Sequence, residues 1–128
     1  MSSSCPCIDH VVGHAAKREF TVSPSDTAIA LGSGSVNVLA TPMAIAWCEA
    51  VTTMAISEAI CADCTTVGYK IDFLHLSPTS IGESVYANAL VESVSGDRII
   101  FSIDLRNAEM QVGTGKITRV RVARNSWI

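Results

Sequence analysis

Charged residues are scarce in this sequence. They make up only 16% of the 128 residues, whereas apolar residues make up 48%. A chain of this length forms one core, and so much apolar side chain is hard to hide within it. We therefore expect a single domain over residues 1–128, with residues 1–15 as a loose N-terminal arm. The apolar excess predicts a large subunit interface, most simply that of a homodimer that could pair further into a tetramer.

Clusters of basic residues are also missing. The formal net charge is −3, and the basic residues gather only at Arg119, Arg121 and Arg124 near the C-terminus. Nucleic acids bind through many cationic contacts, so a nucleic acid is not expected as the main partner. A small polyanionic ligand, reached by two or three basic residues, remains compatible with this composition.

Targeting signals are not recognisable either. The first residues, MSSSCPCIDH, lack the basic start and apolar stretch of a secretory signal. The apolar segment 42–60 is long enough to suggest a membrane span, but Glu49 near its middle opposes insertion. We expect a soluble cytoplasmic protein without a membrane partner.

The five cysteines follow no regular framework and are interpreted as reduced thiols. Cys5, Cys7, Cys61 and Cys64 could together supply four thiolates to zinc, but Cys5-x-Cys7 is tightly spaced and a second C-x-x-C motif is missing. We expect no metal site and no resident cofactor.

One helix and five strands are expected. Thr41-Pro42 is a typical helix start, with Thr as the N-cap and Pro at the first helical position, and the helix extends over Pro42–Ile60. Alternating apolar residues then indicate strands. The expected strands cover residues 17–22, 67–76, 84–94, 98–106 and 112–123. Short connections imply antiparallel neighbours, and a lone helix must lie across the sheet. The sequence predicts an α+β hotdog fold, an antiparallel sheet wrapped around one long central helix.

Glu49 is the most informative residue in this pattern. It is the only carboxylate between Pro42 and Ser57. An unpaired carboxylate on a buried helix is unfavourable, so it must be paired, protonated or used. Burial raises the pKa of such a group and a nearby cation lowers it, and the group can act as a general base toward water. A structural Glu paired with an arginine such as Arg119 is an equally good interpretation.

Two further residues are candidates for chemistry. His75 ends an apolar strand face, where a neutral imidazole can exchange a proton near pH 7, although a satisfied core histidine is the simpler interpretation. Thr41 is expected to cap the helix. The same helix N-terminus is also a place where backbone N–H groups stabilise an oxyanion, and where a hydroxyl can orient or attack a carbonyl.

The segment Ala40–Glu49 (ATPMAIAWCE) resembles the helix start of the fluoroacetyl-CoA-thioesterase-like family of hotdog-fold thioesterases. That family places a catalytic Thr and a catalytic Glu eight residues apart. The segment Gly68–His75 (GYKIDFLH), followed by Gly82, is similar to the family's strand that carries the catalytic His. Residues 112–119 (VGTGKITR) are similar to its final strand, and the resemblance covers about residues 36–123.

This resemblance implies hydrolysis of an acyl-CoA thioester in a crevice at a dimer interface, with coenzyme A as part of the substrate. Glu49 and His75 would activate water or the nucleophile, and Thr41 would attack or hold the thioester carbonyl. The backbone N–H of Gly68 would stabilise the oxyanion. Arg119 would hold the carboxylate network or approach the coenzyme A side.

One segment departs from the family pattern. Members specific for fluoroacetyl-CoA carry a Phe-rich lid before the catalytic Thr, whereas Thr27–Leu39 (TAIALGSGSVNVL) contains no aromatic residue. A short- or medium-chain acyl-CoA is therefore the expected substrate. Two alternatives remain: a non-catalytic binder of CoA esters or another small apolar ligand, and a hotdog hydratase or dehydratase, which carries an Asp and a His close together near a short helix.

Overall fold

The computed structural model describes residues 8–127. The strands are β1 (Ala15–Thr21), β2 (Cys64–His75), β3 (Ser84–Ser95), β4 (Arg98–Arg106) and β5 (Gln111–Ala123). The helices are α1 (Ala28–Leu31) and α2 (Thr41–Ile56), with short 3-10 turns η1 (Asp9–Val11), η2 (Pro24–Asp26) and η3 (Arg124–Trp127). No helix in this described part of the chain is both long and apolar enough to cross a membrane.

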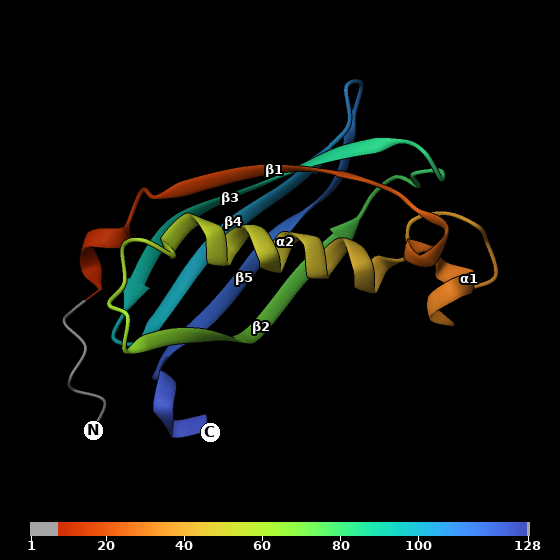
Figure 1. Ribbon diagram of the computed structural model, residues 1–128. Helices are drawn as coiled ribbons and strands as arrows, with labels where there is room; N and C mark the ends of the chain where they lie inside the picture. The colour runs from red at the N-terminus through yellow and green to blue at the C-terminus, as the bar shows by residue number, and fades with distance from the viewer. Residues whose placement is uncertain (1–7, 128) are drawn as a thin grey trace.

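All neighbouring strands are antiparallel, in the order β1-β3-β4-β5-β2, and the sheet curls around α2 (Figure 1). This arrangement confirms the predicted hotdog fold. Strands β1 and β2 are the two edges of the sheet, and the helix packs mainly against β1 and β3. The β2 side of the sheet is therefore left comparatively open.

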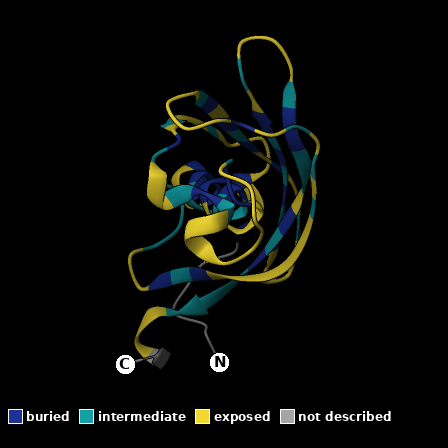
Figure 2. Cartoon of the chain, turned by 90° about the vertical axis from the view of Figure 1, so that its right-hand side faces the viewer, coloured by how far each residue is buried: buried dark blue, intermediate teal, exposed yellow. Residues whose placement is uncertain are grey.

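The core lies between α2 and the concave face of the sheet, as the buried centre of Figure 2 shows. Strand β4 follows the predicted alternation, and its buried side chains are Ile99, Phe101, Ile103 and Leu105. On the β1 side, Trp47 of α2 stacks on Phe20 with ring centroids 4.7 Å apart. The alternate side chains of the strands that point inward and the buried side chains along one face of the helix thus pack into a single core.

The helix differs from its predicted bounds at both ends. Ala40, not Thr41, is the N-cap, and it makes no side-chain capping bond. The Thr41 hydroxyl is instead engaged by His75. At the other end α2 stops at Ile56 rather than Ile60, because the backbone tightens into a turn in which Ala59 N–H donates to Ile56 O.

Two expectations about the N-terminal region and the cysteines are also corrected. Ile8 and Val11 are buried in the core, so the part of the predicted loose arm from residue 8 onward is packed; residues 1–7 lie outside the described part. Cys64 is disulfide-bonded, so the expectation that all five cysteines are reduced is wrong at this position. Cys5 and Cys7, two of the four cysteines considered for a zinc site, lie outside the described residues.

Strand β2 contains an irregularity that the sequence pattern did not predict. Its register with β5 shifts between Gly68 and Lys70, so Tyr69 has no partner in the ladder. The shift breaks the predicted single face over residues 67–75. Gly68 faces Glu49 on α2, whereas Tyr69 accepts a hydrogen bond from Arg98 of β4. A bulge of this kind re-aims side chains near functional sites.

Candidate active site

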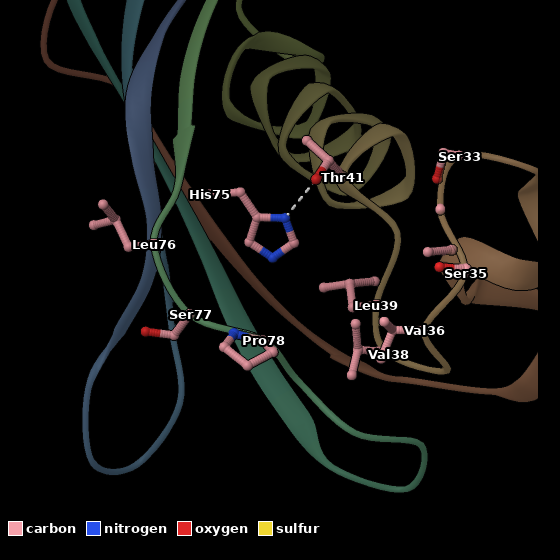
Figure 3. Close-up of a pocket in the computed structure, with 12 residues that line it drawn as sticks. Ser33, Ser35, Val36, Val38, Leu39, Thr41, His75, Leu76, Ser77 and Pro78 are labelled. Atoms are coloured by element: carbon pink, nitrogen blue, oxygen red, sulfur yellow. Dashed lines mark hydrogen bonds between the residues drawn. The ribbon is translucent and has the colours of Figure 1, made fainter.

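Thr41 and His75 meet at the N-terminal end of α2. Thr41 is the first residue of the helix and His75 is the last residue of β2. The Thr41 Oγ1 atom lies 2.7 Å from His75 Nδ1, the bond drawn in Figure 3. Backbone bonds fix the approach to the helix, since Leu39 N–H donates to Thr79 O and Ala40 N–H donates to Asp26 O. The structure therefore brings these two predicted site residues into direct contact.

A cavity of about 340 Å³ opens beside this pair. One wall is formed by His75 and the residues that follow it, and the other by the segment after α1, residues 33–39. The pair at its mouth and the largely apolar lining are what a small-molecule site requires.

The second ring nitrogen of His75, Nε2, is enclosed in the structure. Nε2 is buried and makes no hydrogen bond to any described residue. Burial lowers the pKa of His75 below its ordinary value, and the nearby Ser77 backbone, which favours the charged ring, offsets only part of this effect. The imidazole is therefore neutral at pH 7, with one nitrogen held by Thr41 and the other unpaired.

Glu49 lies in a second cluster, with Arg119 and Thr66. The Arg119 Nη1 atom is 3.4 Å from Glu49 Oε2, and the Arg119 side chain donates both to Thr66 Oγ1 at 2.8 Å and to the Thr66 carbonyl at 3.0 Å. Burial lowers the pKa of Arg119, while the Glu49 charge raises it. The pairing with Arg119 that the sequence offered as an alternative is thus present. Thr66, which fixes the guanidinium, was not predicted.

Gly68 is the strand residue that accommodates the Glu49 carboxylate. A Cβ atom at this position would lie 2.7 Å from Glu49 Oε2, closer than a methyl group and an oxygen can approach. Gly68 is paired with Arg119 in the ladder, immediately before the bulge. The bulge, the missing side chain and the buried arginine together hold one helix carboxylate against the edge strand.

The two clusters do not converge within one chain. Thr41 and Glu49 are eight residues apart on α2, so the helical rise separates their Cα atoms by about 12 Å. Gly68 and His75 are seven residues apart on β2, about 23 Å for an extended strand. The predicted meeting of Thr41, Glu49 and His75 is therefore reached only in part: Thr41 contacts His75, and Glu49 contacts Arg119 and Gly68.

The thiol of Cys48, a reactive group next to Glu49 in the sequence, is buried. Burial, with smaller contributions from Asp104 and Glu49, raises the pKa of the Cys48 thiol to about 12, so it stays protonated.

Asp9 and His14, with four residues between them, are an Asp and a His close together in the sequence, as a hydratase or dehydratase would carry. Both are exposed, and neither lines the cavity at Thr41. They do not form the enclosed pair that a dehydratase uses.

With this geometry established, the chain can be compared with known proteins. A family model described as FlK, fluoroacetyl-CoA-specific thioesterase, matches residues 22–125. The chain belongs to this family. The match includes α2, β2 and β5, the elements that carry the five predicted site residues. A search of curated proteins finds no match.

Solved structures show the same fold at low sequence identity. One structure of the fluoroacetyl-CoA thioesterase FlK is 21% identical, with a TM-score of 0.85 over 91% of this chain and 90% of that one. A hot-dog-like protein from Thermanaerovibrio acidaminovorans is 20% identical, with a TM-score of 0.86 over 94% and 91% of the two chains. A Thermus thermophilus thioesterase superfamily member is 20% identical, with a TM-score of 0.82 over 90% and 85%.

Proposed function

We propose that this protein hydrolyses a short- or medium-chain acyl-CoA thioester to the free acid and coenzyme A. The observation that carries the proposal is the 2.7 Å contact between Thr41 Oγ1 and His75 Nδ1 at the mouth of the 340 Å³ cavity. Family membership supports thioester hydrolysis in general. The lack of aromatic residues around the cavity supports a general acyl group over fluoroacetyl.

The proposed chemistry assigns a separate task to each cluster. When the Thr41 hydroxyl donates to Nδ1, the hydrogen of the neutral imidazole resides on Nε2, where it donates to the thioester oxygen. The Glu49 carboxylate accepts a proton from water as the water oxygen attacks the carbonyl carbon. The tetrahedral intermediate then collapses, the C–S bond breaks, and the leaving thiolate takes up the proton from Glu49.

Arg119 and Gly68 support the carboxylate in this scheme. Arg119 is held by Thr66 and keeps one oxygen of Glu49 in place, so it acts as a positioning residue. The backbone N–H of Gly68, next to the bulge in β2, would donate to the developing oxyanion. Water, carbonyl and base must come within about 3 Å of one another, which the two separated clusters of one chain do not allow.

A second copy of the chain resolves this separation. The β2 edge exposes an apolar run, namely Val67, Tyr69, Ile71, Leu74 and Leu76. The opposite edge, β1, carries the charged sequence Lys17-Arg18-Glu19 and is thereby protected from pairing. An exposed apolar edge strand favours pairing with another strand, and a two-fold axis makes that pairing antiparallel. We infer a homodimer joined through β2.

The position of the axis follows from the exposed run. A two-fold axis between antiparallel copies of one strand pairs a residue with its own copy, so we centre it on Asp72, near the middle of residues 67–76. Because Tyr69 is the extra residue of the bulge, Gly68 then lies opposite the partner's His75. The Glu49 carboxylate, which lies against Gly68, then faces Thr41 and His75 of the other copy. Each of the two active sites is therefore proposed to combine Thr41 and His75 of one subunit with Glu49 of its partner.

Release of free thiol from a series of acyl-CoA esters tests the proposed function. We expect turnover by the wild-type protein and a loss of about 10²- to 10⁴-fold in kcat for Glu49→Gln, which removes the base but keeps the shape. Wild-type kcat in the Glu49→Gln variant would contradict the mechanism.

A binder of CoA esters is the second candidate, because the Glu49–Arg119 ion pair can also serve structure alone. Tight binding of every ester without release of thiol would support that function over hydrolysis. The same titration, followed at the absorbance of an enoyl-CoA, detects a hydratase.

A further inference from the structure

The cavity beside Thr41 and His75 has walls of two different kinds. Its apolar part consists of Val36, Val38, Leu39, Leu76 and Pro78. Hydroxyl groups face it from Ser33 and Ser35, on the wall opposite His75 (Figure 3). A further lining hydroxyl, that of Ser77, is already used, because it donates to Gln111 O. Ser33 and Ser35 are exposed and make no side-chain hydrogen bond to any described residue.

Charged groups do not line this cavity. None of the lining residues is Lys, Arg, Asp or Glu, and burial keeps His75 neutral. Phosphate and carboxylate groups are bound where cations or several N–H donors offset their charge. The cavity is therefore unsuited to the diphosphate of coenzyme A and to an acyl chain that ends in a carboxylate. An uncharged acyl group is what its lining fits.

The two serines are held in place by the turn that follows α1. Gly32 ends the helix in the left-handed region with φ of 74°, and Ser33 N–H donates to Ala28 O at 3.0 Å. A bridge between Thr27 and Leu39 closes the segment at its base. Gly34 itself lies close to Ala28, since a Cβ there would be 3.2 Å from the Ala28 methyl. The hydroxyls thus stand on an ordered wall.

From these observations, and resting on the proposed thioesterase function, we infer that the cavity binds the acyl part of the substrate and selects a chain with an uncharged hydrogen-bonding substituent, of which a hydroxyl is the simplest. The apolar floor would cover the carbon chain beyond the thioester. Ser33 and Ser35 would bind the substituent and act as specificity-determining residues. Because both hydroxyls are exposed and reach water in the free protein, the substituent exchanges one hydrogen bond for another, and the expected selectivity is modest.

Matched thioesters test this inference. We expect kcat/KM for 3-hydroxybutanoyl-CoA, and for 3-hydroxyhexanoyl-CoA, to exceed that of the unsubstituted ester of equal length by about five-fold, the effect of one net neutral hydrogen bond. Succinyl-CoA, which has the same number of carbons but a terminal carboxylate, is expected to be the poorest of the four-carbon esters. In the double variant Ser33→Ala/Ser35→Ala, the preference for the hydroxyl is expected to fall to about one-fold.

Ser95→Ala is the matched control, because Ser95 is an exposed serine at the far end of β3 and lines no part of this cavity. It should leave the hydroxyl preference unchanged. A wild-type preference of one-fold or less, or a preference that survives in the double variant, would overturn the inference while leaving thioesterase activity intact. If no ester is hydrolysed, the proposed function fails instead. Calorimetric titration with non-hydrolysable thioether analogues then still decides whether the serines select the hydroxyl.

Discussion

Thr41 Oγ1 lies 2.7 Å from His75 Nδ1, and this bond leaves the buried Nε2 as the ring nitrogen without a hydrogen-bond partner among the described residues. The relationship joins the start of the central helix to the end of the edge strand. It also separates two roles, because the hydroxyl orients the imidazole while the imidazole meets the ligand.

The first prediction concerns the Thr41 hydroxyl. Thr41→Ser keeps the hydroxyl, so we expect kcat within a few-fold of wild type. Thr41→Val keeps the shape but cannot bond to His75 Nδ1, so we expect kcat to fall by about 10²-fold or more, in the range of lost catalytic hydrogen bonding. Steady-state kinetics on one acyl-CoA ester compares the two. Equal activity of the Ser and Val variants would rule out this role for the hydroxyl.

The second prediction concerns pH. Because burial lowers the pKa of His75 below its ordinary value of 6.5, more than half of the imidazole is neutral at pH 6.5 in the folded protein. We expect the acid limb of kcat/KM that belongs to this group to have its midpoint below pH 6.5. An acid limb centred at or above pH 6.5 would contradict the burial of this histidine.

The same lowered pKa affects stability. Below pH 6.5 the unfolded chain binds a proton at position 75 that the folded chain resists. The contribution of His75 to the free energy of unfolding is therefore fully present above pH 6.5 and declines as the pH falls toward the lowered pKa. The pH dependence of unfolding in His75→Gln, measured against wild type, isolates this contribution from the exposed His10 and His14.

The third prediction concerns the close approach of Glu49 to Gly68. Gly68→Ala places a methyl group only 2.7 Å from Glu49 Oε2. We expect a loss of about 1 to 2 kcal/mol in the free energy of unfolding, typical of overpacking, together with reduced kcat. In a Glu49→Ala background the stability loss should largely disappear. A double-mutant cycle from denaturant unfolding measures this coupling, and additive losses would show that the two residues are independent.

The fold was predictable from sequence wherever one periodicity ran without interruption. Strand β4 has the predicted bounds of Arg98–Arg106, because its apolar and polar residues alternate without a break. The bulge at Tyr69 was missed because the apolar residues Val67, Tyr69, Ile71 and Phe73 alternate through it, without the change of phase that an extra residue imposes on the buried face. The helix C-terminus at Ile56 was missed for a similar reason: the apolar residues Ala59 and Ile60 continue the helical pattern into a turn.

The candidate site was predictable as residue types but only partly as geometry. Spacing and resemblance selected Thr41, Glu49 and His75, and the Arg119 pairing was foreseen as an alternative. The eight-residue spacing already places Thr41 and Glu49 about 12 Å apart on the helix. Which of the two His75 meets depends on how α2 crosses β2, which sequence spacing does not specify. Thr66 and the two cavity serines are ordinary hydroxyl residues in the sequence, and only tertiary contacts single them out.

The fourth prediction concerns Arg119, whose side chain is 9% exposed. Arg119→Met leaves Thr66 without its two donors and Glu49 without its cation, so we expect a loss of about 2 kcal/mol in the free energy of unfolding. Arg106→Met is the matched control, because Arg106 is 51% exposed in its pair with Asp104. That pair should contribute less than about 0.5 kcal/mol. Urea unfolding of both variants checks the difference, and equal losses would contradict a special role for Arg119.

The central claim is that each active site combines residues of two subunits. Thr41→Val and Glu49→Gln are each expected to be nearly inactive alone. When the two variants are co-expressed, or refolded together, half of the dimers are mixed. One of the two sites in each mixed dimer then retains Thr41, His75 and the partner's Glu49, so activity should return to roughly a quarter of wild type. A mixture that stays as inactive as its two components would contradict the claim.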